Sequence, residues 1–356
     1  MTTLSAKTRP PGREHPLPWR PMARVTWRQH RGALITLVAA SAALALAIVA
    51  GELDVQGPYA RYAADGCIIR PIHVPCGTLA NTIGAGTNGL DALVIALHVL
   101  PVLIGVFLGA PLIAREVESG TFRFTWTQGV GRTRFVAITI VLLAAVVTVA
   151  TCALGALLAW YAHPFEAVGL TSHFQAGFFD TAALAFPAWT LFALCIGTFL
   201  GALIGRVVTA MAAAAAAAGG LLVAAFWELD HHLLSLGAVA TPVRPTGGLF
   251  LGLLNMAAEP GLGPPGSWLV RGWITGPGGY QLSSTAASNL QNRMNAATIK
   301  PGSSEAAWMS LHHYTYWLSY QPADRFWYFQ AITGAALAAL ATAFAVMTVL
   351  LVRSRR

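Results

Sequence analysis

Two histidine pairs come nearest to a metal-binding arrangement in this sequence. They are His231 with His232 and His312 with His313, and the carboxylate residues Glu228 and Asp230 precede the first pair. Imidazole and carboxylate groups are ligands for borderline cations such as zinc. The spacing matches no recognisable ligand set, so no metal ligand is assigned. A metal-dependent membrane enzyme is therefore kept only as the weaker alternative.

Motifs of nucleotide binding and of hydrolytic catalysis do not occur in the chain. A phosphate-binding loop G-x-x-x-x-G-K-[ST] needs a lysine that reaches the phosphates, and neither Lys7 nor Lys300 stands in such a frame. The patterns G-x-S-x-G and H-E-x-x-H are also missing. We therefore expect no enzymatic activity from this chain by itself.

Long stretches without formal charge dominate the sequence. Of the 356 residues, 56% are hydrophobic and 10% are charged, against roughly 25% charged residues in a soluble domain. Six apolar runs each have the length of a helix that crosses a bilayer, which needs about 20 residues. The runs are Gly32 to Gly51, Ala92 to Ala114, Phe135 to Tyr161, Thr181 to Gly205, Val207 to Trp227 and Phe326 to Val352. Because backbone polar groups in lipid need internal partners, the runs predict an all-α integral membrane protein with six transmembrane helices.

The segments between these runs define the domain organisation. Arg206 alone separates the fourth run from the fifth, which predicts a tight hairpin that turns near Gly205 to Thr209. The predicted parts are a basic N-terminal segment (1–31) with an interfacial helix from about Pro21 to His30, helices one to five (32–227), a large outer loop (228–325), and helix six with a basic tail (326–356).

Basic residues favour one orientation of these helices. If the N-terminus is cytoplasmic, 15 of the 22 lysines and arginines fall in cytoplasmic segments, so both termini are predicted to lie inside the cell. The net charge of +8 does not indicate nucleic-acid binding, because the basic residues flank apolar runs. Twenty arginines against two lysines, with abundant alanine and glycine, are typical of a bacterial genome rich in G and C. We expect a multi-pass protein of the bacterial cytoplasmic membrane.

The cytoplasmic segment 115–134 combines charges with an unusual density of aromatic residues. Arg115, Glu116 and Glu118 directly follow the second run, and Gly120 can end its helix. Phe122, Phe124 and Trp126 then follow within a short connection. Aromatic groups in such a place indicate an interfacial helix or a surface that a partner buries.

This segment resembles the first cytoplasmic loop of ABC-2-type transporter permeases, particularly their actinobacterial branch. The matching residues are Pro111, Leu112, Ala114, Arg115, Glu116, Glu118, Gly120, Thr121, Arg123, Trp126, Thr127 and Gln128. A second match precedes the last run and consists of Tyr320, Gln321, Pro322, Arg325, Phe326, Trp327 and Gln330. Arg325, Phe326 and Trp327 would lie at the outer membrane interface.

The resemblance implies a permease subunit in an ABC-2 exporter-like bundle, energised by a separate ABC ATPase that binds ATP and Mg. A second permease copy or a paralogue would complete the membrane part. The segment 115–134 would dock in a groove of the ATPase. Glu116 and Glu118 would pair with basic groups there, while Arg123 and Trp126 would fill the groove. The scarcity of ionisable groups in the apolar runs favours an amphipathic or apolar cargo. A membrane scaffold or sensor subunit remains the alternative function.

Small residues recur at helical spacing in two of the runs. Gly197, Gly201 and Gly205 repeat every four residues in the fourth run, and Gly105 and Gly109 do so in the second. This spacing lets helix backbones approach closely. Packing within one subunit is favoured over a seam between two subunits.

Two features distinguish the outer segments. Cys67 and Cys76 are the only cysteines predicted to face an oxidising compartment, so they form a disulfide or remain as two free thiols. In the larger segment, residues 247–258 are apolar but too short to cross, which predicts a re-entrant or interfacial helix. Residues 259–302 are predicted to be loop, and the aromatic residues between 305 and 320 are predicted to form a belt at the membrane surface.

Overall fold

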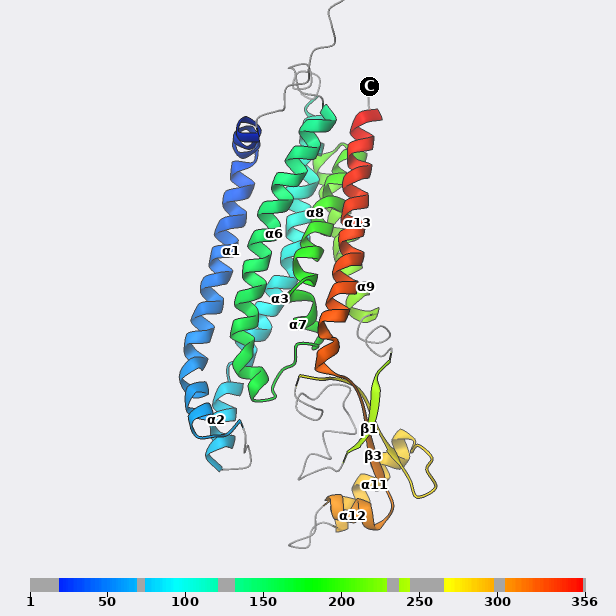
Figure 1. The fold of residues 1–356 in the computed structure, drawn as a ribbon. Helices are drawn as coiled ribbons and strands as arrows, with labels where there is room; N and C mark the ends of the chain where they lie inside the picture. Colours follow the sequence, from blue (N-terminus) through cyan, green and yellow to red (C-terminus); the bar gives the residue numbers. More distant parts are fainter. Residues whose placement is uncertain are drawn as a thin grey trace, which may run out of the picture.

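Six long helices form a bundle, and a small α/β unit lies at one end of it (Figure 1). The structure is a computed structural model that describes residues 19–68, 74–120, 132–228, 237–243, 266–297 and 305–354. Within these residues six helices are long and apolar enough to cross a membrane, which confirms the six predicted spans. The C-terminus and the start of α1 lie at the same end of the bundle, opposite the α/β unit (Figure 1).

The second span consists of three consecutive helical elements. The spans are α1 (Trp19–Ala64), then α3 (Thr87–Leu103) with the π-helical turn η1 (Ile104–Gly109) and α4 (Ala110–Glu118), then α6 (Arg132–Ala167), α8 (Ala185–Ile204), α9 (Val207–Glu228) and α13 (Phe326–Ser354). The short helices α2 (Val74–Gly84) and α7 (Ala176–Thr181) precede the second and fourth spans.

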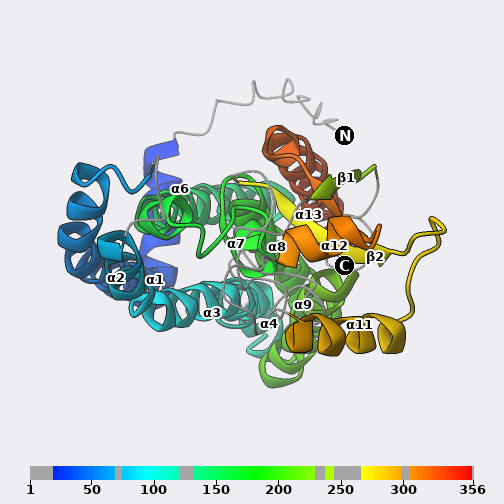
Figure 2. The same ribbon diagram turned by 90° about the horizontal axis from the view of Figure 1, so that it is seen from below.

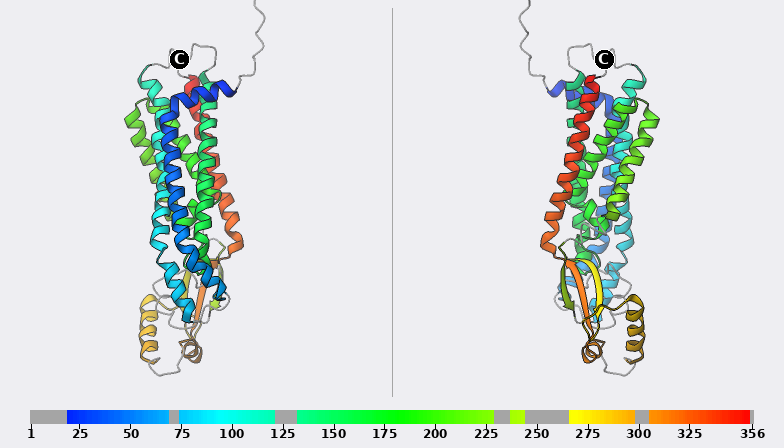
Figure 3. Two further views of the ribbon diagram at one scale, coloured as in Figure 1. Left: turned by 90° about the vertical axis from the view of Figure 1, so that its left-hand side faces the viewer. Right: turned by 90° about the vertical axis from the view of Figure 1, so that its right-hand side faces the viewer.

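Helix α1 extends beyond the predicted first span at both ends. It is a single helix of 46 residues, whereas about 20 would cross the hydrocarbon core. Its first turns lie across the end of the bundle, and the helix then bends to run along it (Figure 3). The segment predicted as a separate interfacial helix, Pro21 to His30, is thus continuous with the first span.

Helix α8 is the centre of the bundle, with α6, α9, α13 and the second span around it (Figure 2). The side chains of Phe186, Trp189, Phe192 and Leu194 are all buried. A helix that is apolar on all sides is typical of such a position. Because α8 contacts these neighbouring spans, any of them that moves must change its packing against α8.

The helical backbone breaks just before α8. The fourth span was predicted to begin at Thr181, but α7 ends at this residue and α8 begins only at Ala185. Ala182 between them is extended, and Ala183 has a φ of 44°, in the left-handed region. Such a conformation is uncommon for a residue other than glycine, so the neighbouring structure has to stabilise it.

The turn between α8 and α9 is as tight as predicted. Gly205 ends α8 in the left-handed conformation with a φ of 69°, and its N–H donates to the carbonyl of Gly201. Helix α9 begins at Val207, so Gly205 and Arg206 are the whole connection. A glycine is required here because a Cβ atom disfavours this conformation.

The α/β unit contains an antiparallel sheet in the order β1-β3-β2. Its strands are β1 (Val239–Val243), β2 (Trp268–Thr275) and β3 (Thr315–Gln321), and its helices are α11 (Ser284–Ala297), α12 (Glu305–Leu311) and the 3₁₀ turn η3 (Ala323–Arg325). The side chains of Tyr316, Leu318 and Ile274 pack with Leu290 of α11 and Met309 of α12 into one buried cluster. This face of the sheet thereby forms a small core of its own.

The α/β unit differs from the sequence-based prediction in three respects. The protein is mostly helical but not all-α, since the sheet adds three strands. Residues 259–302 are not simply loop, because they contain β2 and α11. Among the aromatic residues predicted as a belt between 305 and 320, Tyr316 is 2% exposed in the buried cluster of the unit, and Trp308, Tyr314 and Tyr320 pack against that cluster. The predicted re-entrant helix 247–258 lies outside the described residues.

Candidate functional site

Four of the five predicted packing glycines, Gly105, Gly109, Gly197 and Gly201, lie at a contact between the second span and α8. A Cβ atom on Gly105 would be 2.6 Å from the carbonyl oxygen of Ala193, and one on Gly109 would be 2.7 Å from that of Leu194. From the other side, Cβ atoms on Gly197 and Gly201 would collide with the backbone of the second span. Because these glycines bring the two backbones together, no flexible side chain separates the spans.

An irregular helix segment lies at this same contact. The turn η1 is π-helical, and it follows Pro101 and precedes Pro111. Proline has no N–H, so it cannot complete the regular hydrogen-bond ladder of an α-helix. Single π-helical turns are frequent at functional positions. The second span is thus irregular where it touches the central helix.

The second span ends in the charged residues predicted to begin the coupling segment. Arg115 is exposed, Glu116 is partly buried, and Gly120 ends the helix with a φ of 68°. The hydroxyl of Ser119 donates to the carbonyl of Arg115 at 2.7 Å. The other predicted coupling residues, Thr121, Arg123, Trp126 and Gln128, lie outside the described residues.

Glu118 has a partner within its own chain. Its Oε2 accepts a hydrogen bond from the backbone N–H of Val207, with an N···O distance of 2.7 Å. Val207 is the first residue of α9, where backbone N–H groups lack helical partners and an anion is favoured. Glu118 therefore caps α9 and joins the end of the second span to the α8–α9 hairpin. Sequence reasoning assigned Glu118 to a partner protein, and nothing in its spacing indicated this helix cap.

The three residues predicted at the outer interface have different environments. Trp327 is 63% exposed, whereas Phe326 is buried among Phe174, Phe179 and Trp268. Arg325 donates hydrogen bonds to the side chain of Gln321 and to the carbonyl of Gly237. Of the two aromatic residues, Trp327 is exposed on the surface of the protein and Phe326 is buried.

Gln330, from the same sequence match, stabilises the break before α8. Its side chain is fully buried; its Oε1 accepts from the N–H of Ala185 at 2.9 Å, and its Nε2 donates to the carbonyl of Phe179 at 2.7 Å. These two backbone groups are on opposite sides of the break. One amide of α13 thus satisfies both sides of the break.

We expect Gln330→Leu to destabilise the protein by about 2 to 4 kcal/mol, because it leaves a buried N–H and a buried carbonyl unsatisfied. Unfolding of the purified protein in mild detergent measures this loss. Replacement of the exposed Gln281 by leucine is the control and should leave stability nearly unchanged. Equal stability of the two variants would show that the amide contributes nothing to the break.

His173 forms an ion pair just outside the third span. Its Nδ1 lies 2.8 Å from Oε1 of Glu166. The hydrogen bond with Glu166 raises the pKa of His173 above its ordinary value of 6.5; burial opposes this shift, and the charge of Glu166 adds to it. The pair joins α6 to the segment that leads to α7.

This raised pKa predicts the sign of a pH effect on stability. A group with a raised pKa in the folded state stabilises fully below its unfolded pKa, and the contribution is lost as pH rises through the folded value. Wild type should therefore exceed Glu166→Gln in stability on the acid side of this range, and the difference should shrink on the alkaline side. Unfolding at a series of pH values tests this. A difference that does not depend on pH would contradict the ion pair.

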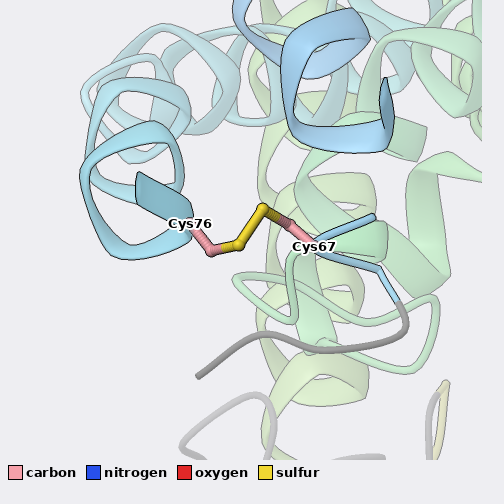
Figure 4. The surroundings of a disulfide bond; sticks show 2 residues. All are labelled: Cys67 and Cys76. Carbon is pink, nitrogen blue, oxygen red and sulfur yellow. A yellow bond between two sulfur atoms is a disulfide. The ribbon is translucent and has the colours of Figure 1, made fainter. Parts of the chain in front are cut away.

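The two cysteines between the first and second spans form a disulfide (Figure 4). Cys67 and Cys76 are nine residues apart, and both side chains are buried. Closing so short a loop stabilises a fold by about 2 to 3 kcal/mol in the chain-entropy description. The bond joins the end of α1 to α2 and so fixes the turn between the first and second spans.

Sequence reasoning missed a buried carboxylate in α1. Glu52 follows the predicted first span directly, yet its side chain is only 4% exposed because α1 continues through it. Its Oε2 has no hydrogen-bond partner among the described residues. The ring of Tyr161 packs directly against the neighbouring Gly51. A Cβ atom on Gly51 would be 2.8 Å from the Tyr161 hydroxyl oxygen, so a larger residue at this position would collide with the ring.

The histidine pairs provide no metal site within the described residues, where no group of three potential ligands occurs. His312 instead stacks on Trp308, and its Nδ1 lies 2.8 Å from the carbonyl oxygen of Trp308. His231 and His232 lie outside the described residues.

Comparison with known families identifies the bundle. The family model described as ABC-2 membrane transporter related matches residues 38–228, which include most of the first span and all of spans two to five. The chain belongs to this ABC-2 family. No curated protein and no solved structure matches it.

Membership in the ABC-2 family identifies the chain as a multi-pass membrane component of an ABC transporter. The component is not itself catalytic, and the family implies an ABC ATPase as its partner. The match contains the second span, the segment 115–134 and the α8–α9 hairpin. The glycine contact and the Glu118 cap thus both lie within the shared region of the family.

Proposed function

We propose that this ABC-2 permease exports an amphipathic or apolar substrate across the cytoplasmic membrane of a bacterium. A separate ATPase binds ATP and Mg and docks on the segment 115–134. Both termini are cytoplasmic, and a second permease copy or a paralogue completes the assembly. The family match and the six spans support this proposal.

The observation that carries the proposal is the rigid path from this segment into the bundle. The segment begins within α4, and the backbone of Ala110 at the start of α4 lies against Gly197 and Gly201 of α8. Glu118 adds a hydrogen bond to the start of α9. A displacement of the segment by the ATPase therefore moves α8 and α9 instead of being absorbed by flexible side chains.

Reconstitution of the permease with an ABC ATPase that co-purifies with it from native membranes tests the proposal. We expect the permease to raise the rate of ATP hydrolysis and to support ATP-dependent movement of an amphipathic fluorescent dye across vesicles. A scaffold or sensor subunit would support no movement of any such dye. An unchanged ATPase rate together with no dye transport would overturn the proposal.

Glu116→Ala should uncouple the two activities. Glu116 is placed at the start of the docking segment, so its loss should leave ATP hydrolysis but lower dye transport at least about tenfold, which corresponds to about 1.4 kcal/mol of coupling. Transport at the wild-type rate, with normal membrane insertion, would contradict the role given to Glu116.

A further inference from the structure

A cavity of about 870 Å³ opens between the first turns of α1 and the second span, and its lining runs from Arg28 to Ala40 and from Leu100 to Glu116. Residues 28–40 of α1 form one wall, and residues 100–116 of α3, η1 and α4 form the other. Its volume is that of a site for a small organic molecule, for which roughly 300 to 1,000 Å³ is usual.

The end of this cavity nearest the start of α1 and the end of α4 is basic. Arg28, Arg31 and Arg115 line it, and Glu116 is the only acidic residue among them. All three arginines are exposed, and no carboxylate of the described residues lies within ion-pair distance of them. Guanidinium groups bind phosphate oxygens through paired hydrogen bonds, which gives this end a preference for a phosphate-bearing anion.

The remainder of the cavity is apolar and open to the bilayer. Leu37, Leu100 and Ile104 form its inner wall, and the side chains of Phe107 and Leu103 are 59% and 44% exposed. At 1.5 Å per residue, the wall from residue 100 to 116 is roughly 24 Å long. An elongated groove with one basic end and an apolar body matches an amphiphile that lies parallel to the helices.

We propose that this groove binds one anionic phospholipid of the leaflet at this end of the bundle. Its phosphate lies against Arg31 and Arg115, with Arg28 beside them, and one acyl chain lies along Phe107 and Leu103. Basic pockets between transmembrane helices are known to select anionic headgroups. A protein docked on the segment 115–134 would contact only the basic end of the groove. A lipid would contact the basic end with its headgroup and the apolar wall with its acyl chain.

The bound lipid would link the first turns of α1 to α4, which make few direct contacts with each other. The first turns of α1 lie across the end of the bundle, and α4 leads to the docking segment (Figure 3). A phosphate between Arg31 and Arg115 would hold these two elements at a fixed separation. The lipid site does not depend on the proposed transport function, so either can fail without the other.

Native mass spectrometry of the full-length protein in detergent tests the site. Phosphatidylglycerol is titrated against phosphatidylcholine with the same acyl chains, and glycerol phosphate is added in a separate arm. We expect one phosphatidylglycerol to bind more tightly than phosphatidylcholine. Arg31→Gln and Arg115→Gln should each weaken binding about fivefold, and the double variant about 25-fold.

Two further variants separate the groove from general surface charge. Ala40→Trp fills the apolar part and should abolish binding of phosphatidylglycerol without removing a charge. Arg134→Gln removes an exposed arginine that does not line the groove and should leave binding unchanged. The substituted positions 31, 40, 115 and 134 are all exposed, so each variant should fold.

Three results would overturn the proposal. The first is equal binding of the two phospholipids. The second is a loss in Arg134→Gln as large as that in Arg31→Gln. The third is displacement of the lipid by glycerol phosphate with no effect of Ala40→Trp, which would show that the basic end binds a free phosphate instead of a lipid.

Discussion

Gly201→Ala should destabilise the protein by about 2 to 3 kcal/mol, although it adds a single methyl group. The new Cβ atom would collide with the carbonyl oxygen of Ala110, which is backbone and cannot rotate away. The second span and α8 would have to separate, and the packing around η1 would be lost with them. Unfolding in mild detergent, followed by loss of helicity, measures the change.

The same substitution at Gly219 is the matched control. Gly219 is a glycine of α9, and a Cβ atom there would meet nothing within 4 Å. Because alanine favours helix over glycine by up to about 1 kcal/mol, Gly219→Ala should be neutral or slightly stabilising. Equal destabilisation of the two variants would mean that Gly201 is not a point of close backbone contact.

Glu118→Ala should nearly abolish transport while the ATPase partner continues to hydrolyse ATP. The variant loses the hydrogen bond to the N–H of Val207, which links the end of the second span to α9. The stability cost should be small, about 0.5 to 2 kcal/mol, as for the loss of a helix cap. We expect dye transport per ATP hydrolysed to fall at least about tenfold, equivalent to about 1.4 kcal/mol of coupling.

Glu118→Gln distinguishes the helix cap from the charge. Glutamine keeps an oxygen that can accept from Val207 but has no negative charge. If the cap transmits the movement, Glu118→Gln should retain much more transport than Glu118→Ala. If instead Glu118 pairs with a basic group of the ATPase, the two variants should be equally defective, and the intrachain link would play no part in coupling.

The number and approximate positions of the membrane spans could be predicted because they depend on local properties. The length of an uncharged run and its helical state follow from the bilayer alone, so all six spans were found. The hairpin at Gly205 and Arg206 was predictable for the same reason, since a longer helix would not fit the membrane. The start of the fourth span was wrong, because Ala182 and Ala183 leave the helix without a glycine or proline to indicate it.

The features that could not be predicted depend on contacts between distant residues. In the sheet of the α/β unit, β2 pairs with β3. Helix α11 packs on Tyr316 and Leu318 and stabilises this sheet. The cap of α9 joins residues 118 and 207, and the amide of Gln330 joins α13 to a break near residue 182. Each of these residues is ordinary in its local sequence, and only the folded chain gives it a partner.

The lipid groove likewise needed the structure. Arg31 and Arg115 each flank an apolar run, which in the sequence indicates only the end of a span. Their position on opposite walls of one cavity follows from the packing of α1 beside the second span. A basic residue at a span end can thus be part of a binding site when a second helix brings another arginine close.

Site-specific crosslinking from Arg123 and Trp126 in native membranes tests the central claim most directly. Each position is replaced in turn by a photoreactive residue in the full-length permease, and a third probe at the exposed Trp327 is the control. The account predicts that the first two positions capture an ABC ATPase and that position 327, at the opposite end of the bundle, does not. Capture of no ATPase from either position, or labelling of both by a reagent that cannot cross the membrane, would contradict it.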